Sequence, residues 1–146
     1  MTEAYFVDTN LLVYFRDSSE AEKQVKAAAW VAFLWERRLG RLSAQVLNEY
    51  YTIVTRKLKP GLSRETARSD IRDLLSWRPL ALDEQVVQKA WSLEDQFSIS
   101  WWDALIASAA QLTGCAVLLS EDLQDGQDLG GLLVVDPFQH PPPNQS

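Results

Sequence analysis

Apolar positions recur along the chain with two different spacings. Short, continuously apolar runs rich in β-branched and aromatic residues predict buried strands at residues 4–7, 116–119 and 132–135. Apolar residues spaced three and four positions apart predict helices at residues 21–38, 44–57, 64–77, 84–97 and 101–112. Weaker patterns predict short strands at residues 41–43 and 79–82 and a short helix at residues 11–15.

The order of these elements favours one fold class. Strands alternate with helices, and the best strands lack the polar alternation of a half-exposed sheet. We therefore expect an α/β fold: a five-stranded, mostly parallel sheet with helices on both faces. The chain of 146 residues suits a single domain, and it shows no internal repeat. We expect the domain over residues 1–138 and a disordered, proline-rich tail over residues 139–146.

Composition narrows the class of protein further. Hydrophobic residues make up 47% of the chain and charged residues 23%, which excludes wholesale disorder. Cys115 is the single cysteine and has no internal partner for a disulfide, so we expect a reducing compartment, the cytoplasm. The start, Met1–Ala4, lacks the basic region of a signal peptide. No apolar run has the length of a membrane span, so we expect no membrane association.

The net charge of −6 argues against a protein that holds nucleic acid by bulk electrostatics. It does not exclude an enzyme that meets RNA through metal ions and a few local cations. The basic residues available for phosphate contacts, most of which are typical of a solvated helix face, are Lys23, Lys26, Arg37, Arg38, Arg56, Lys57 and Lys59.

Two acidic residues follow predicted strands. Asp8 comes directly after the first strand, and Asp122 follows the strand at residues 116–119 after a short gap. Ligands of parallel sheets bind beyond the carboxyl ends of the strands, so both side chains should reach the same rim. Two carboxylates there favour a hard cation such as Mg²⁺ or Mn²⁺. The alternatives are that Asp8 only caps a helix and that Asp122 only begins a turn.

Two further acids lie on predicted helices. Glu49 lies at the edge of the apolar face of its helix, where a carboxylate is costly unless it is paired or binds a metal. The alternative is an edge glutamate that extends into solvent or pairs with Arg56. Asp103 stands three residues after Ser100, as in a capping box, so helix capping is a sufficient explanation of this acid alone.

Four short motifs together resemble the PIN-domain family. They are Phe6-Val7-Asp8-Thr9-Asn10, the segment from Leu42 to Glu49, Trp101-Trp102-Asp103-Ala104-Leu105-Ile106, and the segment from Leu118 to Gly126. Each motif is weak alone, but the four occur in the family's order and span residues 5 to about 137. Within the family, the chain most resembles the VapC-like toxins of prokaryotic toxin–antitoxin pairs.

The resemblance implies an acidic metal site, Mg²⁺- or Mn²⁺-dependent cleavage of RNA, a homodimer and a cognate antitoxin. Carried over by position, the metal ligands or their supports are Asp8, Glu49, Asp103 and Asp122. Thr9 resembles a hydroxyl residue that orients the site, and Asn10 one that supports the first loop. Either Glu121 or Asp125 is an alternative to the fourth acid. The number of metal ions stays open.

Other chemistries have less support. The only histidine, His140, lies in the predicted tail, which disfavours a histidine-based ribonuclease. A haloacid-dehalogenase-like phosphatase needs a second aspartate two residues after the first, where this chain has Asn10. A non-catalytic partner-binding module on the same fold is the remaining alternative.

For an antitoxin, we expect contact at the apolar helix surface near Trp30–Trp35, with a basic side chain entering the acidic pocket. Trp101 and Trp102 are candidates for substrate contact, although core packing is more typical of at least one.

Overall fold

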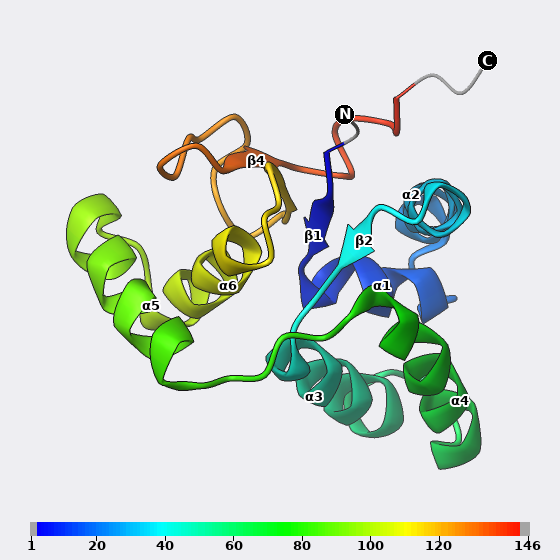
Figure 1. Cartoon of the computed structure of the whole chain (residues 1–146). Coiled ribbons are helices and arrows are strands. Elements are labelled where there is room, and N and C mark those ends of the chain that lie inside the picture. The colour runs from blue at the N-terminus through cyan, green and yellow to red at the C-terminus, as the bar shows by residue number, and fades with distance from the viewer. Residues whose placement is uncertain (1–2, 144–146) are drawn as a thin grey trace.

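A parallel sheet of four short strands forms the centre of the computed structural model, which describes residues 3–143 (Figure 1). In pairing order, the strands are β2 (Gly40–Arg41), β1 (Tyr5–Val7), β3 (Val117–Leu119) and β4 (Leu133–Val135). Each strand pairs with its neighbours in parallel. The expected α/β class with a parallel sheet is confirmed.

Helices cover the sheet on both sides. α5 and α6 pack against each other on one side, and α1 and α2 pack together on the other (Figure 1). None of the helices in the described chain has the length and apolarity needed to cross a membrane. The helical segments are α1 (Thr9–Arg16), α2 (Ala21–Arg37), α3 (Ala44–Thr52), η1 (Ile53–Lys57), α4 (Arg64–Leu74), η2 (Leu75–Trp77), α5 (Glu84–Phe97) and α6 (Trp101–Leu112).

Polar side chains cap the first turns of four helices. Ser43, Ser63, Asp83 and Ser100 each accept a hydrogen bond from the backbone N–H three residues later. These bonds satisfy donors that have no partner inside the helix. Asp8 caps α1, which therefore begins two residues before its predicted start.

The prediction of a fifth strand at residues 79–82 is wrong. Within the described residues, Leu80 makes one parallel bridge to the segment after β2. Its N–H donates to the Leu42 carbonyl at 3.1 Å, and its own carbonyl accepts from the Ala44 N–H at 2.8 Å. Pro79 has no N–H to donate and the two residues after Leu80 are exposed, so the pairing does not extend.

Two predicted helices change geometry before their predicted ends. The helix predicted at residues 44–57 is α-helical to Thr52 and continues as the π-helix η1. The helix predicted at residues 64–77 ends as the 3₁₀-helix η2. Periodicity near 3.6 residues does not separate these geometries over a single turn.

The sheet and the helices share one apolar core. Phe6, Val7, Leu118 and Leu119 have no exposed surface, as expected of strands covered on both faces. Cys115 is also buried and is a free thiol. A reducing compartment stays a prediction.

The first part of the predicted tail has a defined position in the structure. The Trp30 indole N–H donates to the carbonyls of Pro137 and His140, and His140 Nε2 lies 2.7 Å from an oxygen of Asp125. The backbone is therefore held against α2 as far as His140. Residues 144–146 lie outside the described residues, so the predicted disorder is not tested there.

Gly40 provides a test of how the edge strand packs. A Cβ at this position would lie 2.6 Å from two ring atoms of Trp77. Gly40→Ala should therefore lower the free energy of unfolding by about 1–3 kcal/mol, measured by urea denaturation. In a Trp77→Phe background the same substitution should cost clearly less, because the smaller ring leaves room. Equal costs in the two backgrounds would show that the indole is not the cause.

Candidate functional site

The carboxyl ends of β1 and β3 bring together segments that lie 112 residues apart in the chain. Val7 pairs with Leu119 at the last position of both strands, and the Asp8 N–H donates to the Leu119 carbonyl at 3.1 Å. Asp8 and Ser120 therefore leave the sheet side by side. This is the rim at which the sequence predicts carboxylates.

Asp8 is buried at this rim, with 7% of its surface exposed. Its Oδ1 accepts from the Thr9 N–H at 2.7 Å, and its Oδ2 accepts from the Ser120 hydroxyl at 2.8 Å. Burial raises the pKa of Asp8 to about 7, and the charges of Asp122 and Glu49 add to this rise, whereas the two hydrogen bonds oppose it. Asp8 is thus both a helix cap and a carboxyl group whose charged form is disfavoured by burial and by neighbouring acids.

Glu49 reaches the same place from α3. It is half-buried beside the apolar face of the helix, as predicted. The Thr9 hydroxyl donates to its Oε1 at 3.3 Å, and the Trp102 indole N–H donates to its Oε2 at 2.8 Å. Burial raises the pKa of Glu49 against these two bonds. Its partners are neutral donors, so the alternative pairing with Arg56 is not formed.

Asp122 lies in the loop after β3 and is held by Asn10. The Asn10 amide donates to both carboxylate oxygens at 3.0 Å, and the Asp122 N–H donates to Ser120 Oγ at 3.2 Å. Partial burial raises the pKa of Asp122, and the charges of Asp103 and Glu121 raise it further. Asn10, which we expected to support the first loop, bonds the fourth acid in the loop after β3.

Asp103 lies in the first turn of α6. Its N–H donates to the Ser100 hydroxyl at 3.1 Å, so the expected cap is present. Among the described residues, however, nothing donates a hydrogen bond to its carboxylate, and the return half of a capping box is missing. The charge of Asp103 raises the pKa of Asp122, which connects it electrostatically with the acids of the rim. Capping accounts for its backbone and leaves its carboxylate unexplained.

The two alternatives to the fourth acid have partners elsewhere. Glu121 forms an ion pair with Lys23 at 2.9 Å. Asp125 accepts from the Asp136 N–H at 2.9 Å and contacts His140. Asp122 is thus the acid of this loop that lies with the other predicted site residues.

Two residues of the site, Ser120 and Gln45, escape sequence reasoning, whereas Trp102 is already a candidate for substrate contact there. Ser120 bonds Asp8, and its signal is its position directly after β3, where a polar side chain reaches the rim. Trp102 bonds Glu49 and is 49% exposed, and Trp101 is 36% exposed, so neither packs in the core. Gln45 lies one turn before Glu49, and its amide lowers the pKa of Glu49, although its buried nitrogen makes no hydrogen bond of good geometry in the described chain. No pattern along the sequence marks the last of these.

The four carboxylates suit a hard cation by chemistry, because every donor is an anionic oxygen. The ion pairs among the described residues involve other acids, so no lysine or arginine there neutralises Asp8, Glu49, Asp103 or Asp122. The side chains have not closed into a cluster: within residues 3–143, no three acidic, histidine or cysteine side chains gather closely enough to hold a metal. The chemistry of these donors suits Mg²⁺ or Mn²⁺.

The raised pKa of Asp8 predicts how stability depends on pH without metal. The folded state holds this proton up to about pH 7, whereas an unfolded aspartate loses it near the ordinary pKa of 3.8. Stability should therefore fall as pH rises between these values and level off above about 7. In EDTA, Asp8→Asn removes this loss. Its stability gain over the wild type should grow from pH 5 to pH 8 by up to about 3 kcal/mol.

Chemical denaturation at several pH values measures this difference. Asp95→Asn, on the exposed face of α5, is the matched control and should show no such growth. A gain for Asp8→Asn that is independent of pH would contradict the burial of an ionisable group at this position.

Three solved structures share the fold at low sequence identity. A toxin–antitoxin complex from Klebsiella pneumoniae has a TM-score of 0.61 and 18% identity, over 92% of this chain and 98% of that chain. VapC20 of Mycobacterium tuberculosis, a toxin that cleaves the sarcin–ricin loop, has a TM-score of 0.61 and 21% identity, over 82% and 92%. DNA-bound VapBC from Salmonella typhimurium has a TM-score of 0.64 and 15% identity, over 93% and 99%. At such low sequence identity, these structural similarities show a shared fold alone.

Sequence comparison gives the family. A search of curated proteins finds no match. The sequence profile of the PIN domain matches residues 5–124, which is most of the chain and includes all four acids of the rim. The chain belongs to the PIN-domain family.

Proposed function

We propose that the protein is a Mg²⁺- or Mn²⁺-dependent endoribonuclease that hydrolyses phosphodiester bonds in RNA. The observation that carries the proposal is that Thr9, Asn10 and Ser120 connect Asp8, Glu49 and Asp122 by hydrogen bonds at one end of the sheet. None of these three acids has a basic partner among the described residues. Membership of the PIN-domain family supports it, and so does the fold shared with VapC20, which cleaves an RNA loop.

In this proposal Asp8, Glu49, Asp103 and Asp122 hold the cation, directly or through water. When bound, the cation supplies Lewis acidity toward the phosphodiester and neutralises its developing charge. A bound cation would offset the cost of burying the charged form of Asp8, which is the main cause of its raised pKa, and would relieve the smaller repulsion from Asp122 and Glu49.

Neighbouring groups of the protein orient three of the four carboxylates. Ser120 and the Thr9 N–H orient Asp8, and Asn10 fixes both oxygens of Asp122. The Thr9 hydroxyl and Trp102 orient Glu49. Such fixed placement reduces the reorganisation needed when the phosphate is attacked.

Glu49 and Asp103 are the carboxylates that can accept a proton from the attacking water. Trp102 is half-exposed beside Glu49, where its ring can contact a nucleotide base.

We further propose that the protein is the toxin of a toxin–antitoxin pair and forms a homodimer. The fold shared with toxin–antitoxin complexes supports the antitoxin, and the resemblance of the sequence supports the dimer. The expected apolar surface is smaller than predicted, because Trp30, Phe33 and Leu34 are buried; of that stretch, Val31 and Trp35 line a groove beside α1 and α4.

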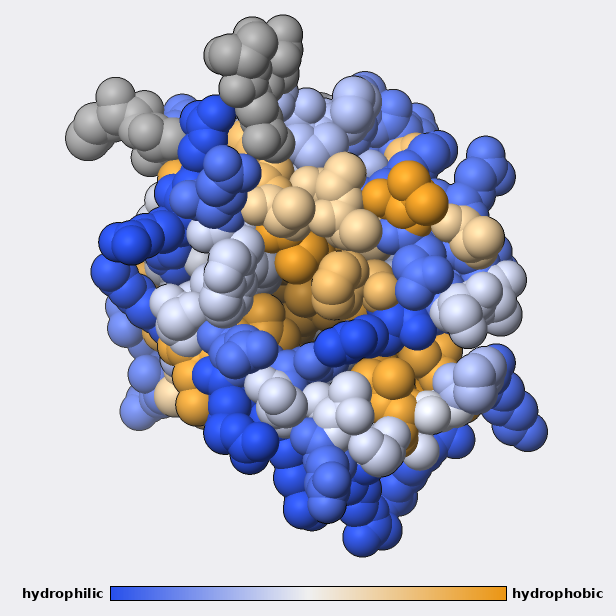
Figure 2. Space-filling model, turned by 90° about the vertical axis from the view of Figure 1, so that its right-hand side faces the viewer, coloured by the Kyte–Doolittle hydropathy of each residue, from blue (hydrophilic) through white to orange (hydrophobic). Residues whose placement is uncertain are grey.

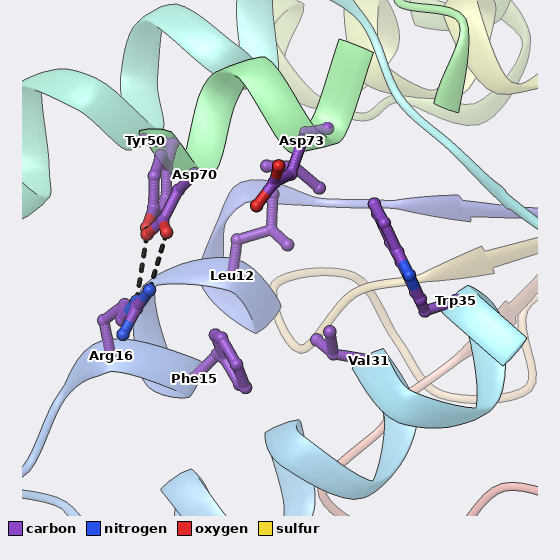
Figure 3. Close-up of a pocket in the computed structure, with 9 residues that line it drawn as sticks. Leu12, Phe15, Arg16, Val31, Trp35, Tyr50, Asp70 and Asp73 are labelled. Atoms are coloured by element: carbon purple, nitrogen blue, oxygen red, sulfur yellow. Dashed lines mark hydrogen bonds and ion pairs between the residues drawn. The ribbon is translucent and has the colours of Figure 1, made fainter. Parts of the chain in front are cut away.

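This groove lies between α1, α2 and α4. Figure 3 shows Leu12, Phe15, Val31 and Trp35 around it, with Arg16 bonded to Asp70 at one end. On the face formed by α2 and α4, hydrophobic residues floor a hollow bordered by hydrophilic ones (Figure 2). An amphipathic antitoxin segment suits such a groove, with a basic side chain continuing to the acidic rim.

Cleavage by the purified protein tests the enzymatic proposal. With Mg²⁺ or Mn²⁺, the wild type should cut defined tRNAs or a structured single-stranded RNA. Asp8→Asn should lower the rate at least about a hundredfold, because it removes a ligand charge. Asp125→Asn, in the same loop as Asp122 but bonded to His140, should cleave as the wild type does. Sequencing gels measure rates and cut positions.

Metal binding gives an independent readout of the same site. At about tenfold excess over its dissociation constant, the cation should add about 1.4 kcal/mol of stability and raise the melting temperature by a few degrees. EDTA should reverse the rise, and Asp8→Asn should blunt it. A folded wild type that neither cleaves RNA nor responds to metal would favour the non-catalytic binding module.

The partner proposal is tested by co-purification with the product of the neighbouring reading frame. Val31→Asp should weaken that complex about tenfold or more, because it buries a charge in the groove. Val25→Asp is the matched control, since Val25 lies on the same helix but is 70% exposed outside this groove. Light scattering gives the oligomeric state of the free chain. Equal effects of the two substitutions would argue against the groove.

A further inference from the structure

Three arginines converge on one cavity away from the acidic rim. Arg38, Arg41 and Arg78 line a hollow of about 430 Å³ together with Trp35, Ser76 and Trp77. Arg38 and Arg41 flank the start of β2, where Gly40 pairs with Tyr5, the first residue of β1. Asp8 follows the opposite end of β1, so the arginine cavity and the acidic rim belong to opposite ends of the sheet.

The positive charge of this cavity is uncompensated. None of the ion pairs among residues 3–143 includes Arg38, Arg41 or Arg78, although the chain as a whole has a net charge of −6. Arg41 Nη1 donates to the carbonyl of Gly40 at 2.7 Å and more weakly to that of Arg38. These bonds fix one guanidinium and leave its other donors free. In an acidic protein, such a local cluster is the part of the surface that suits a polyanion.

The backbone adds a second observation. Arg38 ends α2 and Arg78 ends η2, both in the left-handed conformation, with φ of 58° and 55°. Glycine or asparagine occupies this conformation more readily than arginine. Of the three non-glycine residues with positive φ in the described chain, two are thus arginines that face the same cavity. Strain at a residue with an exposed charged side chain points to a role for that side chain.

Aromatic rings complete the cavity. Trp77 is buried, and its ring packs over Gly40, where only a glycine leaves it room. Its centroid lies 5.9 Å from that of Trp35, which is 47% exposed. Trp77 therefore supports a partly open indole beside three guanidinium groups. Guanidinium groups bind phosphates through paired hydrogen bonds, and an open indole stacks on bases.

We propose that Arg38, Arg41, Arg78 and Trp35 form a second RNA-binding site, which holds the phosphate backbone of the substrate at a distance from the bond that is cut. This inference rests on the proposed function for the identity of the polyanion. It also explains how a chain with a net charge of −6 retains RNA, because the contacts are local and their field is short-ranged in salt.

The test measures RNA binding without cleavage. The full chain is titrated in EDTA with a fluorescein-labelled single-stranded oligoribonucleotide, and anisotropy gives the dissociation constant at several salt concentrations. Arg38→Asn with Arg78→Asn should raise this constant about fivefold or more. The slope of log K against log salt should become shallower by roughly 1.4, about 0.7 for each phosphate that is no longer bound. Because asparagine accepts the left-handed conformation, the melting temperature should stay at or above that of the wild type.

Two further variants make the result decisive. Arg64→Gln with Arg68→Gln removes the same charge from exposed positions of α4 and should bind RNA as the wild type does. Arg41→Gln changes an extended residue of β2, so it tests the site without the left-handed caps. Equal losses of affinity in the cavity and control variants would reduce the effect to net charge and overturn the proposal. Unchanged RNA affinity combined with abolished binding of an acidic peptide would overturn it in favour of a protein-binding surface.

Failure here is distinct from failure of the proposed function. If the cavity variants bind RNA normally while Asp8→Asn abolishes cleavage, the second site is wrong and the ribonuclease stands. If the cavity variants no longer bind RNA but the wild type never cleaves it, the binding site stands and the ribonuclease is wrong.

Discussion

The parallel pairing of β1 with β3 is the interaction on which the rest of the acidic site depends. Each strand is three residues long, yet their shared register ends at Val7 and Leu119, and the next residue of each chain segment faces the other. Asp8 and Ser120 are therefore hydrogen-bonded although 112 residues separate them. The loop after β3 then carries Asp122 to Asn10, so the same pairing also sets the position of the fourth acid.

The carboxylates of the rim differ in their partners from Asp70 and Glu121. Asp70 is bonded by Arg16 and Glu121 by Lys23, which gives each charge a counter-charge. The carboxylates of the rim that are hydrogen-bonded receive instead the neutral donors of Ser120, Thr9, Asn10 and Trp102. Neutral donors orient a carboxylate without cancelling its charge, so burial and, to a smaller extent, repulsion between the acids raise the pKa values of Asp8, Glu49 and Asp122. That is the electrostatic condition under which a divalent cation stabilises a folded protein.

The acidic rim and the arginine cavity lie at opposite ends of the sheet, a separation of charge that the net charge of −6 does not reveal. Asp8, Glu49 and Asp122, which form no ion pair among residues 3–143, lie beyond the carboxyl ends of the strands, whereas Arg38, Arg41 and Arg78 line one cavity near the start of β2. A polyanion such as RNA is repelled by the metal-free rim and attracted by the arginine cavity. Under the proposed function the two ends of the sheet act differently. The arginine cavity binds phosphate directly, whereas the acidic rim binds phosphate only through a cation.

Local chemistry along the chain determined most of the elements and the four acids. Helix caps such as Ser43 and Ser100 act within three residues, and continuous apolar runs mark β1 and β3, so short-range physics is sufficient for them. The amphipathic face of α3 likewise placed Glu49 at the border of the core. The resemblance of four motifs to the PIN-domain family indicated which four acids belong to one site.

Only the tertiary structure decided which contacts those residues make. The segment at Pro79 has the propensity of a strand, but pairing needs a donor and a neighbour, and proline removes the donor. Asp122 was distinguished from Glu121 and Asp125 by partners on distant elements, Asn10 of α1, Lys23 of α2 and His140 near the end of the chain. The arginine cavity joins the ends of α2 and η2 across β2. Such choices depend on distances between segments remote in sequence, which no local pattern encodes.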